Sequence, residues 1–460
     1  MHQPDYFLWL GRRAQVIWAA SPAATPDRRI RAGRETFATG ASRRACLSFQ
    51  AIDLSACVHH FGEAHVGDAM PDLNLPCIYC WGRSGDPSFS LEHIWPQSLG
   101  GAFMPDLFKT DQVCKRCNSL AGQFVDGAFL KSWFLAAENT SAAHRYLDKD
   151  KPSAMPLFYH GVSEDFPCAP EETCERWIGP SGDHIYHIHT KDDDRWDTFA
   201  GGDVIKRNRD PGRAYMALTS EHPYWFATSA LSFLARFEGA RHRLLSQVEG
   251  LDFGPKLLNP FQEPISDVER DEVNFILNMP NWQSAKVPMQ IDFAERFLCK
   301  LAIGLAYKAL GHGVMETPYV TELRRGLWTT GFQERQTLRV RGKNFWSQTD
   351  DQHALDMLHW SGAWVISLNA FPDGFAITVI TPGGRHLGIL ATEGHKGWAP
   401  EAGPIYSPGQ VYLVVPQRQT VVGPLPMTVY SSFKAGLDRN QHLEQLRAME
   451  TQISDLPPKR

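Results

Sequence analysis

The pattern of apolar and polar positions predicts a strand-rich C-terminal part. From Asp351 onward, short apolar runs at 363–368, 375–380, 386–390 and 411–415 alternate with turn signals. These runs contain many β-branched and aromatic residues, which favour strands. Turn sequences at 372–374 and 382–384 separate the first three runs. The pattern therefore predicts an antiparallel meander, with a role in recognition, regulation or oligomerisation.

The middle of the chain alternates between helical and strand-like patterns. Residues 293–310 are apolar almost all round and end at Gly311, which predicts a central buried helix. Residues 224–247 and 131–139 are also predicted as helices, and short strand-like runs occupy 145–230. Within 184–189, alternation places His187 and His189 on one face with Ile185. That face fits either a metal site or a partly exposed strand.

The candidate chemistry gathers between residues 77 and 118. Two Cys-x-x-Cys pairs, Cys77 with Cys80 and Cys114 with Cys117, have the spacing of a tetrahedral zinc site closed by four thiolates. Such a site ties the ends of the intervening segment together. By themselves, paired cysteine knuckles are more often structural or binding modules than catalysts. Here, however, the segment between them carries a Glu-His pair and a Gly-Gly turn.

The residue types of this segment suit hydrolysis of a phosphodiester bond. The reaction needs a water made nucleophilic and stabilisation of charge at the phosphate. His93 can accept the proton of the water, because an unperturbed imidazole has a pKa of about 6.5. Glu92 and Asn118 can supply the oxygen ligands that Mg²⁺ or Mn²⁺ prefers. If residues 91–95 form a strand, Glu92 and His93 point to opposite faces.

Residues 75–130 resemble the HNH endonuclease family, in the variant with paired knuckles, a Glu-His-Ile-x-Pro core and a Cys-x-x-Cys-Asn followed by Gly and Asp. The resemblance implies a zinc-stabilised ββα-metal unit with His93 as the general base. It also implies Glu92 and Asn118 as ligands of a catalytic Mg²⁺ or Mn²⁺, and a structural Zn²⁺ on the four knuckle cysteines. Many members carry an Asn where this chain has Lys109, which leaves open the residue that orients His93; Asp111 is a candidate.

Length and composition set the domain organisation. A chain of 460 residues with 43% hydrophobic residues suggests two or three globular domains. We expect an α+β chain with a poorly ordered tail at 1–70, the nuclease domain at 71–135, a mixed and helical accessory domain at 136–350 and a strand-rich region at 351–460. The Arg-rich, acid-poor tail fits a basic arm, a targeting peptide or an over-extended start ahead of Met70.

Charge restricts how nucleic acid can bind. The formal net charge is −5 and gives no general attraction to phosphates, so binding of DNA would depend on local patches. Two candidate patches are Lys115 with Arg116, and Lys206 with Arg207 and Arg209. The nine cysteines, five of them outside the knuckles, fit free thiols in a reducing cytoplasm. The chain contains no uninterrupted run of about eighteen apolar residues, so no transmembrane helix is indicated.

These features together predict a metal-dependent HNH-type endonuclease that acts on nucleic acid, with DNA as the favoured substrate. The accessory region loosely resembles that of large bacterial HNH proteins, some of which act in defence against phage. An activating ligand or partner protein is expected at the C-terminal region. Two alternatives remain open: a non-catalytic zinc-dependent binding or regulatory protein on the same scaffold, and a nicking enzyme for structured or RNA-containing substrates. The binding protein would not need Glu92, His93 or Asn118.

Overall fold

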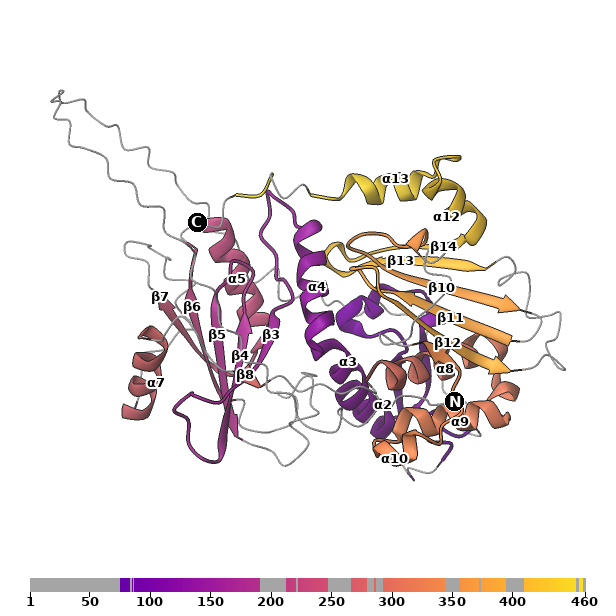
Figure 1. Cartoon of the computed structure of the whole chain (residues 1–460), viewed down its shortest axis with the longest axis horizontal. Coiled ribbons are helices and arrows are strands. Elements are labelled where there is room, and N and C mark those ends of the chain that lie inside the picture. The colour runs from indigo at the N-terminus through magenta and orange to yellow at the C-terminus, as the bar shows by residue number, and fades with distance from the viewer. Residues whose placement is uncertain are drawn as a thin grey trace, which may run out of the picture. The chain divides into compact units, whose positions relative to one another are not determined.

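The computed structural model describes most of the chain from residue 75 onward (Figure 1). The described residues all belong to one compact unit. The predicted tail at 1–70 and the basic patch of Lys206, Arg207 and Arg209 lie outside them. Within the described part, no helix is both long and apolar enough to cross a membrane. The described ranges are 75–82, 85, 87–190, 212–220, 222–246, 266–278, 285–286, 293–343, 356–371, 374–393, 409–451 and 455–457.

The nuclease-like segment forms a strand pair followed by a helix. Strands β1 (Phe89–His93) and β2 (Lys109–Cys114) are antiparallel, and α2 (Lys115–Ala121) begins directly after β2. A π-helical turn over Gly122–Asp126 leads into further helices. These helices are α3 (Gly127–Lys131) and α4 (Trp133–Arg145). Ser132 between them has a ψ of 135°, which is not helical, and it therefore ends α3.

A second sheet forms the accessory region, with the described strands in the order β7-β6-β5-β4-β3-β8. The sheet lies between α5 (Pro223–Arg236) and α7 (Asp267–Leu277) (Figure 1). Alternating side chains of its strands pack against α5 on one face and α7 on the other. Its strands are β3 (Phe158–Ser163), β4 (Glu172–Ile178), β5 (His184–Thr190), β6 (Arg213–Leu218), β7 (Arg241–Ser246) and β8 (Ala285–Lys286).

The predicted helix over 224–247 is wrong in its second half. Helix α5 ends at Arg236, and Gly239 has a φ of 90°, which a helix does not allow. Residues 241–246 instead form β7, which pairs in parallel with β6. The basic side chains Arg241 and Arg243, which looked like the end of a helix, both form ion pairs with Glu269 of α7. Partners distant in the sequence therefore decided the structure of this segment.

The C-terminal part forms the predicted antiparallel sheet. The predicted runs are strands, and the first three form the expected meander. The order of its described strands is β14-β13-β10-β11-β12-β9. Together with the helices, this sheet confirms the α+β class. The strands are β9 (Gly342–Lys343), β10 (Trp364–Phe371), β11 (Gly374–Ile380), β12 (His386–Glu393), β13 (Gln410–Val415) and β14 (Thr420–Pro426).

Helices cover both faces of the C-terminal sheet (Figure 1). Trp364 and Ile366 of β10 face the long helix α8 (Phe293–Leu310), whereas Val365 between them faces the opposite side. As predicted, α8 is a buried helix, and α9 (Pro318–Trp328) packs beside it. The remaining described helices are α10 (Phe332–Arg335), α12 (Met427–Lys434) and α13 (Gln441–Ala448).

Helix α8 joins the nuclease-like segment to the C-terminal sheet. One hydrophobic core contains the four knuckle cysteines, the apolar side chains of α8 and α9 and one face of the sheet. Trp95, two residues after the end of β1, contacts both Phe297 of α8 and Trp364 of β10 edge to face. The end of the strand that carries the Glu-His pair is therefore fixed by packing against α8 and β10.

Candidate active site and metal centre

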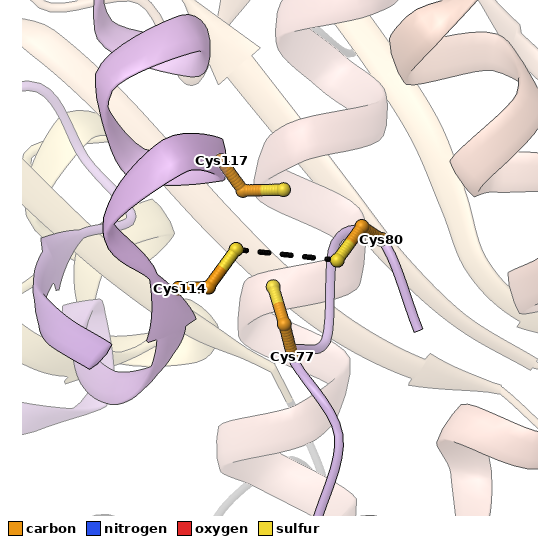
Figure 2. A group of neighbouring side chains, drawn as sticks. All are labelled: Cys77, Cys80, Cys114 and Cys117. Atoms are coloured by element: carbon orange, nitrogen blue, oxygen red, sulfur yellow. Dashed lines mark hydrogen bonds between the residues drawn. The ribbon is translucent and has the colours of Figure 1, made fainter. Parts of the chain in front are cut away.

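The four knuckle cysteines form one buried cluster. Their sulfur atoms lie within 4.8 Å of one another, and the Sγ atoms of Cys80 and Cys114 are 4.0 Å apart. Figure 2 shows the four side chains turned toward a common centre: Cys77 and Cys80 from the turn before β1, Cys114 from the end of β2 and Cys117 from α2. Zn–S bonds of about 2.3 Å would place neighbouring sulfurs roughly 3.8 Å apart. The cluster therefore fits a structural zinc site.

Four buried thiols in such close contact can lose their protons only when a cation compensates the negative charge of the thiolates. The hydrogen bonds of Cys117 with Cys77 and Cys80, together with burial, raise the pKa of Cys117 far above that of a free thiol. Without a metal, the negative charges of neighbouring thiolates would repel one another in a site shielded from water. A divalent ion removes this repulsion, because it binds the thiolates directly.

The side chain of His93 is half-buried at the end of β1. Its cross-strand neighbour is Lys109, and the Nε2 of Gln97 lies 3.2 Å from its Nδ1. Burial, together with the positive charges of Lys109 and Lys300, lowers the pKa of His93 to about 4. The imidazole is therefore neutral near pH 7, which is the form that accepts a proton.

The neighbouring Glu92 points to the opposite face of the strand and is buried. Its Oε1 accepts a hydrogen bond from the hydroxyl of Tyr79 and lies 2.8 Å from the Nζ of Lys300. The same ammonium contacts Asp126 Oδ2 at 2.6 Å and donates to the backbone oxygen of His93. Burial opposes the charge on Lys300, but the two carboxylates outweigh it and raise its pKa.

This placement separates the two residues that were predicted to share the reaction. The side chain of His93 is half-buried on one face of β1, whereas Glu92, on the opposite face, belongs to a buried ion cluster with Lys300 and Asp126. In this arrangement a protein cation already neutralises the carboxylate of Glu92. To bind a metal at the same site as His93, Glu92 would have to leave Lys300. Its predicted role as a metal ligand therefore stays a prediction.

Asn118 ties α2 to β1. Its Nδ2 donates to Ser90 Oγ at 3.0 Å and to the backbone oxygen of Leu91 at 2.8 Å. The register of β1 with β2 shifts between Ser90 and Glu92, so Asn118 holds the irregular part of the strand that leads to His93. Among the described residues, no hydrogen bond reaches its Oδ1, which keeps that oxygen available to a cation.

Sequence reasoning missed the residues that contact the Glu-His pair from outside the hairpin. The local pattern places Lys300 only within a buried helix, and nothing in that pattern links it to Glu92. Gln97 had a weak signal, since it lies four residues after His93 beyond Pro96. The imidazole contact comes from Gln97, and Lys109 instead donates to the backbone oxygen of Ala102. Lys115 and Arg116 are exposed on the first turn of α2.

The order of these elements is knuckle, strand carrying the Glu-His pair, strand ending in the second knuckle, and helix. The family model of the HNH endonucleases matches residues 77–134. These residues are an HNH endonuclease domain. The HNH match ends close to the start of α4, so it does not cover the accessory and C-terminal sheets. Comparison with curated proteins found no match, and neither did comparison with solved structures.

The HNH domain therefore confirms the predicted family resemblance and supports a nuclease-type function. Its ββα unit lies at the predicted place, with the four cysteines gathered at the end of the strand pair where β1 begins and β2 ends. The domain is in direct contact with α8, which lies far along the chain from it. The contacts of Lys300 with Glu92, His93 and Asp126 make α8 part of the immediate surroundings of the HNH motif.

Proposed function

We propose that this protein is a metal-dependent endonuclease that hydrolyses phosphodiester bonds in nucleic acid, with DNA as the favoured substrate. The observation that carries the proposal is the HNH domain with a neutral, half-buried His93 on a strand fixed by the four-cysteine cluster. A base that is held in one position and is unprotonated at neutral pH can accept the proton of a water. The HNH match alone would also fit a scaffold that has lost its reaction.

His93 acts as the general base. Its imidazole accepts one proton from a water, and the resulting hydroxide attacks the phosphorus while the bond to the leaving sugar oxygen breaks. The Nε2 of Gln97 lies 3.2 Å from Nδ1 and 3.4 Å from Nε2 of His93, and this contact limits rotation of the imidazole. Asn118 fixes the strand end below this ring. Both are positioning contacts in the reaction.

A divalent Mg²⁺ or Mn²⁺ would stabilise charge on the phosphate and on the leaving oxygen. The Oδ1 of Asn118 is the better supported protein ligand, because its amide nitrogen is already committed to Ser90 and Leu91. Glu92 is the second predicted ligand and would have to exchange Lys300 for the ion. The exposed Lys115 and Arg116, on the first turn of α2, would contact the phosphate backbone.

Cleavage of supercoiled plasmid by the purified full chain tests this function. We expect nicking or linearisation with Mg²⁺ or Mn²⁺, none with EDTA, and a loss of at least 100-fold in His93→Ala. His442→Ala, which changes an exposed histidine on α13, serves as the matched control and should cut like the unaltered protein. Retention of cleavage by His93→Ala would contradict the assignment of the base.

Two further variants separate the roles of the other residues. Asn118→Ala is expected to lose activity, with partial recovery at higher Mn²⁺ if a metal ligand was removed. Glu92→Gln keeps the shape of the side chain but removes its charge. If Glu92 ligates the ion, Glu92→Gln should lose cleavage at a preserved unfolding midpoint. If it serves only the buried cluster, Glu92→Gln should change the midpoint more than the cleavage rate.

The main alternative is a non-catalytic nucleic-acid-binding or regulatory protein on the HNH scaffold. It predicts that the protein binds labelled DNA or RNA without cutting it, and that His93→Ala binds equally well. The same assay on structured and RNA-containing substrates tests the nicking alternative. A role in bacterial defence against phage and control by a ligand or partner protein remain part of the proposal. Comparing phage plaques on cells carrying the unaltered protein or His93→Ala tests the first of these.

A further inference from the structure

A second cluster of metal-binding side chains lies in the accessory sheet, outside the HNH domain. It consists of Glu175 on β4 with His187 and His189 on β5. One candidate ligand atom from each lies within 4.8 Å of the other two, and all three residues are at most 6% exposed. The HNH match does not include them, and the proposed cleavage reaction makes no use of them.

The sheet itself brings the three residues together. Glu175 and His187 are direct cross-strand partners on the antiparallel pair β4–β5. His189 follows His187 by two residues and so points to the same face, with the ring centroids 4.8 Å apart. The Nδ1 of His187 is 3.9 Å from Glu175 Oε2. Bonds of about 2.1 Å to a metal would put such atoms roughly 3.4 Å apart, so a small closure suffices.

We propose that Glu175, His187 and His189 bind a transition-metal ion, with Zn²⁺ as the best-fitting class. Two imidazoles and one carboxylate suit zinc and its first-row neighbours, whereas Mg²⁺ and Ca²⁺ prefer oxygen ligands. Three protein ligands leave a fourth position open for water or another ligand. This differs from the four-cysteine cluster, in which the protein fills all four positions.

Lys131 of α3 is the main competitor for the carboxylate. Its Nζ lies 2.6 Å from Oε1 of Glu175, whereas His187 lies on the side of Oε2. The two oxygens therefore have different neighbours, and a metal can take Oε2 while Lys131 holds Oε1. Such an outer contact fixes the orientation of a ligating carboxylate. A hydroxide at the open position would offset part of the added positive charge.

A cavity of about 380 Å³ reaches the residues around this cluster. Lys131 and Trp177 both line it, and both contact Glu175. Tyr159 and Arg236 also belong to its wall, and Lys131 lies over the ring of Tyr159 at 4.5 Å. The cavity therefore approaches the cluster through Lys131 and Trp177, whereas Glu175, His187 and His189 do not line it.

Metal analysis of the purified full chain tests the proposal. We expect two transition-metal ions per chain for the unaltered protein after loading with Zn²⁺. The double variant His187→Ala/His189→Ala should retain one, and Cys117→Ser should lose the other. His184→Ala changes a histidine on the opposite face of the same strand and should keep both. If the double variant keeps the same metal content as the unaltered protein, the proposal is wrong.

A second measurement covers the case in which the double variant does not fold. The Asn118→Ala variant, which lacks a proposed ligand of the catalytic ion, is titrated with Co²⁺ in excess Mg²⁺ and with zinc in the four-cysteine cluster. One further equivalent, bound without thiolate-to-cobalt absorption, is the expected result. No further equivalent, or a bound ion with thiolate absorption, would overturn the proposal. The proposed nuclease activity is tested independently, because His93→Ala should keep both metals.

Discussion

Two adjacent residues of β1 have opposite surroundings. Glu92 is 2% exposed and paired with a lysine, whereas His93 is half-buried and neutral. Strand alternation alone sends their side chains to opposite faces. The residues packed against each face of the strand then set the charge and the burial of Glu92 and His93. At the scale of single residues, the HNH motif is therefore divided into a buried, ion-paired glutamate and a half-buried, neutral histidine.

The protonation of His93 gives a test that does not depend on activity. Titration of the protein labelled at histidine Cε1, followed by NMR, should place the midpoint of His93 near pH 4. In the unfolded chain the value should be about 6.5. Between these two pH values the unfolded state binds a proton that the folded state does not, so stability falls as the pH falls. Lys109→Met should raise the midpoint, because it removes a neighbouring positive charge. A folded midpoint near 6.5 would contradict this account.

At the scale of elements, α8 is the support of the HNH domain. Lys300 reaches Glu92 and Asp126, and Gly304, one turn later, lies against Ile94 directly after β1. A Cβ on Gly304 would lie 2.7 Å from Ile94 Cγ1. Helix and strand can approach this closely only because the helix has no side chain there.

Removal of the buried ammonium should destabilise the protein strongly. Lys300→Met leaves Glu92 and Asp126 buried without their cation, which costs about 3–5 kcal/mol of the free energy of unfolding. Lys308→Met, two turns later on the exposed side of α8, should change it by less than about 0.5 kcal/mol. Denaturation by urea, followed by circular dichroism, measures both. Equal stability of the two variants would show that the ion cluster has little energetic weight.

Two glycine substitutions should have effects of opposite sign. Gly304→Ala forces a methyl group against the fully buried Ile94 and should lower the free energy of unfolding by about 1–3 kcal/mol. Gly122→Ala places the same group in open space on a right-handed helical backbone. It should stabilise the protein by about 0.5–1 kcal/mol through lower entropy of the unfolded chain. The same urea denaturation compares them, and a stabilising Gly304→Ala would disprove the close packing.

At the scale of the whole molecule, the HNH domain shares its core with elements from the far end of the sequence. The knuckle cysteines, α8 and one face of the C-terminal sheet belong to one hydrophobic cluster. The C-terminal sheet is covered on both faces, so its faces offer buried packing surface more than open binding surface. Loss of order at the knuckles should therefore spread beyond the HNH domain.

This coupling predicts a global effect of a knuckle substitution. Cys117→Ser should lower the midpoint of thermal unfolding by about 10 °C or more, because metal binding contributes to folding free energy. Since the core is shared, the near-UV circular dichroism of tryptophans in the C-terminal sheet should change in the same transition. Cys168→Ser, which changes a half-buried cysteine in the accessory region, is the control. A separate early transition confined to the HNH domain would contradict the shared core.

The sequence by itself determined the features that depend on neighbouring residues. The spacing of Cys77, Cys80, Cys114 and Cys117 predicted the metal cluster, and local periodicity predicted α8 and the strands of the C-terminal meander. The alternation of His187 and His189 even placed two of the three residues of the second cluster on one face. These patterns suffice because the period of a helix or strand is a property of the local backbone.

Only the tertiary structure decided which distant residues complete each site. Lys300 lies 207 residues after His93, yet it contacts the backbone of His93 and the carboxylates of Glu92 and Asp126. The ion pairs of Arg241 and Arg243 with Glu269 place residues 241–246 beside α7. The local pattern had predicted that these residues continue a helix. Glu175 joined the two histidines through strand pairing. Burial and charge pairing are properties of the assembled core, so they act on residues whose local sequence carries no trace of the partner.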